Sequence, residues 1–172
     1  MKKIILIGYM GSGKSTIAQL LSEKLGILSF DLDVIIENKT SLTVLQLFKQ
    51  RGEVYFRKLE HQLLLEYLNT NKNMILSLGG GTPCYANNHL LLNGSQIVSI
   101  YLKASIDTLY NRLIVNKDRR PLITDLEDNK LKEFIAKNLF DRSFYYNHAT
   151  FNVNVNDKSP SAIADEIIKL LT

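Results

Sequence analysis

The sequence predicts an α/β domain in which a parallel sheet lies between two layers of helices. Short apolar runs alternate with longer helical patterns along all 172 residues. Two of these runs, 3–7 and 97–102, are almost entirely aliphatic or β-branched, as expected for strands buried on both faces. A glycine-rich turn joins the first run to the first helical segment. We therefore expect one domain over residues 1–172.

The elements follow one another in a regular order. Strands are expected at 3–7, 28–30, 74–78, 97–102 and 150–155. Helices are expected at 15–26, 53–68, 106–115, 128–146 and 159–171, with shorter helical segments at 34–39 and 87–93. Gly26 is placed to close the first helix, and Pro160 lies near the start of the last one. Residues 116–128 have the weakest pattern and predict a mobile loop or lid.

Composition narrows the class of protein. The net charge is +4 at pH 7, but no run of Lys or Arg is longer than two, so a solvated basic surface or an arginine-lined site for small anions is favoured over nucleic-acid binding. Cys84 is the only cysteine, which excludes an internal disulfide and fits a reducing compartment. Residues 1–10 have the charged and apolar parts of a signal peptide, but Lys14 stands where the apolar region should continue, so we do not expect one. No apolar stretch approaches the ~18 residues of a membrane span. We expect a cytoplasmic protein without membrane or nucleic-acid partners.

The segment GYMGSGKS (8–15) carries the strongest chemical signal. It matches G-x-x-x-x-G-K-[ST] and lies between a predicted strand and a predicted helix, as a phosphate-binding loop does. Its backbone amides would surround phosphate oxygens, Lys14 would reach the β- and γ-phosphates of a nucleotide, and Ser15 would hold Mg²⁺. The alternative is a plain glycine-rich turn.

A second magnesium anchor is expected from SFDLD (29–33). Asp31 and Asp33 would point the same way if the second strand continued to residue 33. One carboxylate could then serve the metal while the other serves a substrate hydroxyl. The alternative for Asp33 is that it only caps the helix that follows.

Arginines from three separate segments are candidates for binding anions. Arg57 is followed three residues later by Glu60, which indicates either a surface ion pair or an arginine held ready for a substrate anion. RRPLI (119–123) and RSFYYNHA (142–149) add Arg119, Arg120 and Arg142, as phosphoryl transfer would require. The three histidines show no metal-ligand spacing. The triplet Gly79–Gly81 calls for bare backbone, because glycine weakens helices and strands.

Taken together, these segments resemble the shikimate kinase family, within the nucleoside-monophosphate-kinase-like group of P-loop proteins. The resemblance spans nearly the whole chain and rests on GYMGSGKS, DLD, GEVYFRKLE, SLGGGTP, DRRPLI and RSFYYNHA in that order. It implies a three-layer P-loop kinase fold with a five-stranded parallel sheet of order 2-3-1-4-5. It also implies a substrate-binding region at about 33–61, a lid at about 115–125, and a monomer.

The resemblance implies a role for each matching residue. The ATP site would comprise Gly11, Ser12, Gly13, Lys14, Ser15, Thr16, Arg112, Arg119 and Pro160. Ser15 and Asp31 would hold Mg²⁺, and Asp33 would act on the shikimate hydroxyls as the base. The shikimate site would comprise Asp33, Phe48, Phe56, Arg57, Glu60, Gly79, Gly80, Gly81, Pro121, Leu122 and Arg142. Lys14, Asp33 and Arg119 would be the catalytic residues.

The implied reaction is ATP-dependent phosphorylation of the 3-hydroxyl of shikimate, which feeds aromatic amino-acid synthesis through chorismate. In this reading Arg57 and Arg142 grip the shikimate carboxylate, and the Gly80 amide faces the substrate. Two alternatives stay open at this point. One is another small-molecule kinase of the group, such as a gluconate or nucleotide kinase. The other is a nucleotide-dependent regulatory module without catalysis.

Overall fold

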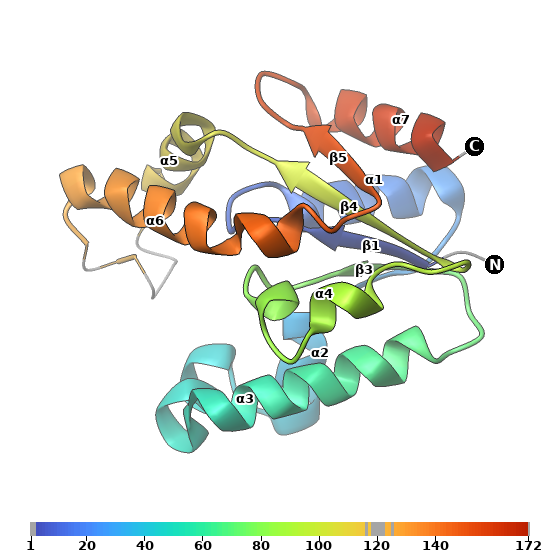
Figure 1. Cartoon of the computed structure of the whole chain (residues 1–172), viewed down its shortest axis with the longest axis horizontal. Coiled ribbons are helices and arrows are strands. Elements are labelled where there is room, and N and C mark those ends of the chain that lie inside the picture. Colours follow the sequence, from blue (N-terminus) through green and yellow to red (C-terminus); the bar gives the residue numbers. More distant parts are fainter. Residues whose placement is uncertain (1–2, 116, 118–122, 125, 172) are drawn as a thin grey trace.

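The computed structural model describes residues 3–115, 117, 123–124 and 126–171. Its five strands form one parallel sheet in the order β2-β3-β1-β4-β5, which confirms the predicted order (Figure 1). The strands are β1 (Lys3–Ile7), β2 (Ser29–Asp31), β3 (Met74–Ser77), β4 (Ile97–Lys103) and β5 (Phe151–Asn154).

Helices cover both faces of this sheet. They are α1 (Lys14–Leu25), α2 (Leu32–Thr40), α3 (Val44–Leu68), α4 (Asn88–Leu91), α5 (Ile106–Ile114), α6 (Asp128–Tyr146) and α7 (Pro160–Leu171), with a 3₁₀ turn η1 (Thr82–Cys84). In Figure 1, α4 and α6 lie in front of the sheet and α1 lies behind it, where it packs on α7. None of the helices in the described part of the chain is long and apolar enough to cross a membrane.

The strongest sequence signals are reproduced in the core. All five residues of β1 are buried, and β1 lies at the centre of the sheet. A strand with neighbours on both sides and helices on both faces has no exposed position, which is why residues 4–7 are aliphatic without alternation. Helix α1 ends as predicted, with Gly26 in the left-handed conformation at φ 65°.

Three local expectations are wrong. The second strand does not continue to residue 33, because it ends at Asp31, whose side chain accepts a hydrogen bond from the Asp33 amide and starts α2. The helix expected at 53–68 begins at Val44, and Gly52 interrupts it with φ 80° and ψ 166°. The helical segment expected at 87–93 contains only the four residues of α4.

Three chain segments meet at the carboxyl edge of the sheet. The phosphate-loop sequence leaves β1, Asp31 ends β2, and the glycine triplet follows β3. Parallel strands bring their carboxyl ends to the same edge, so this edge collects the residues that the sequence singled out. Most of the predicted lid, including Arg119, Arg120, Pro121 and Leu122, lies outside the described residues.

Candidate active site

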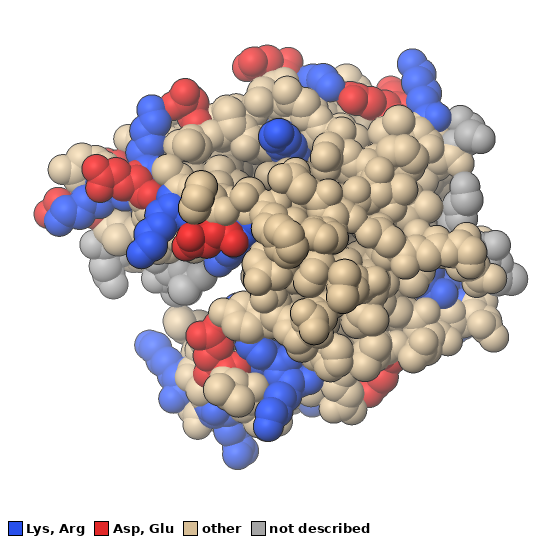
Figure 2. Space-filling view, in the orientation of Figure 1, with Lys and Arg blue, Asp and Glu red and all other residues tan. Residues whose placement is uncertain are grey.

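A cavity of about 500 Å³ opens at this edge of the sheet. It is lined by the phosphate-loop residues 10–17, both aspartates of the DLD segment, the first two glycines of the triplet, and Arg112, Lys158, Pro160 and Ile163. Figure 2 shows the surface hollowed between α6 and the first half of α3, with both cationic and acidic side chains on its walls. The cations that line the cavity itself, Lys14, Arg112 and Lys158, suit an anionic substrate.

The phosphate loop owes its shape to glycines with positive φ. Gly8, Gly11 and Gly13 have φ of 149°, 83° and 100°, which side chains rarely allow. Helical hydrogen bonding in α1 begins at Ile17, whose amide donates to the Gly13 carbonyl. The amides of the preceding turn therefore have no acceptor within the helix, and they present the partial positive charge that binds phosphate.

Two cationic side chains hold the loop from its carbonyl side. Arg112 Nη1 donates to the carbonyls of Gly11 and Ser12 at 3.2 and 3.3 Å, and its Nη2 donates to Val155 O at 3.2 Å. Lys14 Nζ donates to Gly8 O at 2.8 Å and to Tyr9 O at 3.1 Å. Because these bonds turn the carbonyl oxygens of the loop toward Lys14 and Arg112, its backbone amides remain for a phosphate.

Oxygen ligands gather beside the loop. Ser15 Oγ donates to Asp31 Oδ2 at 3.2 Å, so the hydroxyl at the start of α1 and the carboxylate at the end of β2 lie together. A hydroxyl and a single carboxylate fit Mg²⁺, which prefers oxygen ligands and takes the rest of its shell from water and phosphate. Among the described residues, no group of three or more His, Cys, Asp or Glu side chains could hold a metal ion by itself.

Asp33 lies in an acidic and largely buried environment. Burial, followed by the nearby carboxylates of Asp31 and Glu60, raises the pKa of Asp33 to about 6, although Lys14 acts in the opposite direction. A Cβ on Gly79 would lie 3.1 Å from Asp33 Oδ1, so this carboxylate packs against the glycine triplet. A carboxyl group tuned toward neutral pH and placed beside a lysine has the properties of a general base.

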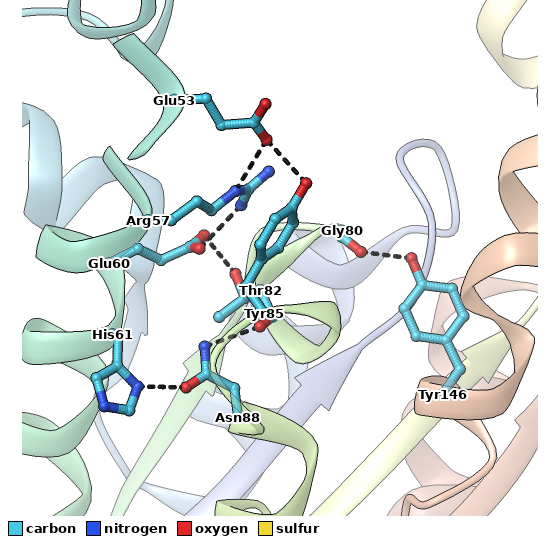
Figure 3. Close-up of polar contacts among 9 residues, drawn as sticks. All are labelled: Glu53, Arg57, Glu60, His61, Gly80, Thr82, Tyr85, Asn88 and Tyr146. Atoms are coloured by element: carbon cyan, nitrogen blue, oxygen red, sulfur yellow. Dashed lines mark hydrogen bonds and ion pairs between the residues drawn. The ribbon is translucent and has the colours of Figure 1, made fainter. Parts of the chain in front are cut away.

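Arg57 is fixed by a network of carboxylates and rings (Figure 3). Its Nη1 donates to Glu60 Oε2 at 2.8 Å, and Glu60 Oε1 accepts from Thr82 Oγ1 at 2.6 Å. Only 1% of the Glu60 side chain and 17% of the Arg57 side chain are exposed, which excludes the surface ion pair. Burial works to lower the pKa of Arg57, but Glu60 more than offsets it and the pKa is raised. The guanidinium therefore stays charged.

Apolar rings complete the surroundings of Arg57. Phe56 is buried and its ring centroid lies 5.1 Å from the Arg57 guanidinium carbon, while the Phe48 centroid lies 5.8 Å away. The two phenyl rings pack on each other at 4.6 Å. Both phenylalanines thus pack beside Arg57, from opposite sides of the break at Gly52.

The second arginine reaches the triplet from α6. A Cβ on Gly80 would lie 3.2 Å from Arg142 Nη1, and the Arg142 guanidinium carbon lies 5.3 Å from the centre of the Tyr9 ring. Tyr146 Oη donates to Gly80 O at 2.6 Å and so ties the triplet to the same helix. In the described part of the chain, no carboxylate forms an ion pair with Arg142.

The triplet is needed for space and not for unusual backbone. None of its three residues has a positive φ. A Cβ on Gly81 would lie only 2.8 Å from Arg57 Nη2, closer than a side chain tolerates. The three glycines therefore admit Asp33, Arg142 and Arg57 respectively to one small volume.

Sequence reasoning missed several residues of this region. Tyr85, Thr82 and Tyr146 hold the arginines and the triplet, and Lys158 and Ile163 line the cavity. Thr82, Tyr85 and Tyr146 lie inside or next to the segments SLGGGTP and RSFYYNHA. Their closeness to these segments was the one feature of the sequence that could have marked them as site residues. The histidines are structural where described: His61 Nδ1 donates to Asn88 Oδ1 at 2.6 Å, and His89 packs against His148.

The fold and the site define a class of protein. A parallel sheet of order β2-β3-β1-β4-β5, a phosphate loop after β1 and a charged cavity at the carboxyl edge are those of a P-loop kinase of the nucleoside-monophosphate-kinase-like group. Comparison with known proteins narrows the class. The shikimate kinase family model matches residues 10–172. A shikimate kinase of Flavobacterium johnsoniae is 57% identical over 171 residues, which are 99% of each chain.

Solved structures agree with this result. A crystal structure of shikimate kinase from Bacteroides thetaiotaomicron has a TM-score of 0.92 at 34% identity and covers 99% of this chain and 98% of its own. Shikimate kinase from Acinetobacter baumannii in complex with shikimate has a TM-score of 0.88 at 30% identity, covering 99% and 93%. The chain belongs to the shikimate kinase family, and this result replaces the gluconate kinase, nucleotide kinase and non-catalytic alternatives.

Proposed function

We propose that the chain performs the reaction of its family, transfer of the γ-phosphoryl group of ATP to the 3-hydroxyl of shikimate, through the residues described above. The observation that carries the proposal is the convergence of Arg57, Arg142 and Asp33 on the glycine triplet beside the phosphate loop. Two arginines can bind one carboxylate, and a carboxyl base beside them can serve a hydroxyl of the same small molecule.

The donor half binds ATP through backbone and cations. Residues Gly11–Thr16 would surround the β-phosphate, and Lys14 would leave its carbonyl partners for the β- and γ-phosphate oxygens. Ser15 and Asp31 would hold Mg²⁺, which when bound neutralises phosphate charge. Arg112 and Pro160, which line the cavity, would contact the adenine.

The acceptor half holds and activates shikimate. Arg57 and Arg142 would pair with the carboxylate and thereby fix which hydroxyl faces the γ-phosphate. Asp33 would accept the proton from the 3-hydroxyl oxygen as that oxygen attacks phosphorus. Phe48 and Phe56 would wall the pocket, and Gly79–Gly81 would leave room for the ring. Glu60 would keep Arg57 oriented, since it occupies Nη1.

Several proposals extend beyond the described residues. Arg119 would come from the lid to stabilise the transferring phosphoryl group, and Pro121 and Leu122 would form part of the wall of the shikimate pocket. We also propose that the enzyme works as a monomer in the cytoplasm and needs Mg²⁺.

A substrate panel tests the proposed function. We expect ADP release, measured in a coupled assay, with shikimate and Mg²⁺-ATP. Quinate, gluconate and nucleoside monophosphates should each react at least about a hundredfold more slowly by kcat/KM, because quinate misplaces the carboxylate, gluconate lacks the ring and nucleoside monophosphates lack the carboxylate. Equal rates with gluconate or a nucleoside monophosphate would overturn the assignment of the acceptor site.

A further inference from the structure

Tyr85 stands directly against the arginine assigned to the substrate carboxylate. The centre of its ring lies 4.1 Å from the Arg57 guanidinium carbon, nearer than the ring of either Phe48 or Phe56. Its hydroxyl donates to Glu53 Oε1 at 2.9 Å, and the same oxygen accepts from Arg57 Nε at 3.3 Å. Tyr85, Glu53 and Arg57 therefore form a closed ring of contacts (Figure 3).

The contacts among Tyr85, Glu53 and Arg57 leave the Nη2 edge of the guanidinium for a substrate. Glu53 uses Nε and Glu60 uses one hydrogen of Nη1. Neither of these bonds involves Nη2, which points at the glycine triplet, where a Cβ on Gly81 would lie 2.8 Å away. The Tyr85 ring covers one face of the guanidinium, and the edge around Nη2 keeps N–H groups for a carboxylate.

The loop that carries Tyr85 is built to hold it there. Ala86 and Asn87, the next two residues, both have positive φ, 48° and 56°, a conformation that costs free energy for residues with side chains. Asn88 anchors the far end of the turn, because its Nδ2 donates to Thr82 O at 2.9 Å and its Oδ1 accepts from His61. The strained turn is thus fixed to α3 on both sides of Tyr85.

We propose that Tyr85 is a positioning residue for shikimate binding: stacked on Arg57 and linked to Glu53, it orients the guanidinium toward the substrate carboxylate. The inference rests on the proposed role of Arg57 as a carboxylate ligand. Tyr85 is 40% exposed, so it contributes little to the core and its replacement leaves the fold intact. It acts on acceptor affinity, since its hydrogen bond and ring contact go to Glu53 and Arg57 and, within the described residues, to none of those assigned to ATP.

The test compares variants of Tyr85 with a matched tyrosine. We expect Tyr85→Leu to raise the KM for shikimate about tenfold, as loss of a cation–π stack beside a shielded charge does, while kcat and the KM for ATP stay within twofold. Tyr85→Phe keeps the ring and should recover most of this affinity. Tyr55→Leu is the control. Tyr55 lies on α3, the helix that carries Arg57, it is 45% exposed, and its ring lies 5.9 Å from a different arginine, Arg51. It should behave like the unmodified enzyme.

A shikimate analogue with a hydroxymethyl group in place of the carboxylate separates positioning from a general structural effect. Tyr85→Leu should leave the KM for this analogue unchanged. A rise for the analogue equal to that for shikimate, or a KM for shikimate that matches Tyr55→Leu, would overturn the inference. Arg57→Lys tests the premise separately: if it leaves the KM for shikimate unchanged, the role of Arg57 fails, and the inference about Tyr85 fails with it. If only Arg57→Lys raises that KM, the inference about Tyr85 alone is wrong.

Discussion

The two glycine clusters of the site meet different physical demands. In residues 8–13 all three glycines have positive φ, and an added Cβ would lie 2.9 Å from Leu102 O at Gly8 but would meet nothing within 4 Å at Gly13. In residues 79–81 no φ is positive, but every added Cβ would press on a charged side chain of the site. Conformation therefore requires glycine throughout the first cluster, whereas lack of space alone requires it in the second.

This difference follows the division of labour between the halves. In the proposed mechanism the donor half binds phosphate with backbone amides, so its chain must turn in ways that glycine allows most easily. The proposed acceptor half would bind a small molecule with side chains from α2, α3 and α6, so the glycine triplet between them must carry no side chains. Substitutions in the first cluster should therefore weaken ATP binding, and substitutions in the second should raise the KM for shikimate.

The largest effect is expected from Lys14→Ala. Lys14 is the phosphate-loop side chain that can neutralise the β- and γ-phosphate oxygens, so phosphoryl transfer should fall by well over tenfold in kcat while the fold survives. Steady-state kinetics and thermal unfolding measure the two quantities. Lys24→Ala, which removes an exposed lysine of the same helix, is the control. Retention of a tenth or more of kcat, a loss below ~1.4 kcal/mol, would contradict the prediction.

Asp33→Asn should come next. The amide is nearly isosteric but cannot accept the hydroxyl proton, and loss of a general base costs about 10²–10⁴ in rate. We expect kcat to fall by that factor while ATP binding, measured by calorimetry, changes little. Unchanged turnover would show that Asp33 is not the general base and has only a structural role in the first turn of α2.

Alanine substitutions in the two glycine clusters test the comparison directly. Gly81→Ala should raise the KM for shikimate about tenfold, since the guanidinium of Arg57 must move and its charge-assisted bonds weaken, with little change for ATP. Gly13→Ala should instead weaken ATP binding and lower stability by ~1–2 kcal/mol through backbone strain.

Gly94→Ala is the matched control for both, because no atom lies within 4 Å of its Cβ position and its φ is not positive. It should change neither the KM for shikimate nor the binding of ATP. If Gly13→Ala and Gly81→Ala weakened binding of the same substrate to the same degree, the two clusters would not differ as described.

The smallest effect is a gain in stability. The pKa of Asp33 is about 6 in the folded protein against 3.8 ordinarily, so between these values the folded state holds more protons than the unfolded one. Stability contributed by Asp33 therefore falls as pH rises from about 4 to 6. Asp33→Asn should raise the free energy of unfolding by ~1–2 kcal/mol at pH 7.5 in EDTA, with the gain vanishing near pH 4. A gain of the same size at both pH values would point to a cause other than this charge.

Sequence reasoning succeeded where the determinants are local. The aliphatic β1, the glycine-rich loop and the C-cap at Gly26 are each decided by neighbours along the chain. It also placed Arg57 and Arg142 in one site, although only through the resemblance to a family. The closeness of Gly80 and Gly81 to these arginines depends on α3, α6 and β3 meeting in space.

The missed features depend on distant contacts. Tyr85 and Tyr146 look like ordinary aromatic residues until their hydroxyls are seen to reach Glu53 and the Gly80 carbonyl. The early start of α3 was hidden because Gly52 interrupts the helical periodicity. Asp31 took the capping role considered for Asp33, because a side chain at the strand end reaches the amide two residues ahead.

The break at Gly52 has a mechanical consequence. Beyond it, Glu53, Glu60 and His61 bind the loop after β3 through Tyr85, Thr82 and Asn88, so this half of α3, which carries Arg57, is tied to that loop. Before it, residues 44–51 carry Phe48 and share none of these bonds. A pivot at Gly52 would move Phe48 relative to Phe56, against which its ring packs at 4.6 Å, while Arg57 kept its place beside the loop after β3. Such a pivot would change the apolar contacts around Arg57 without changing the position of its charge.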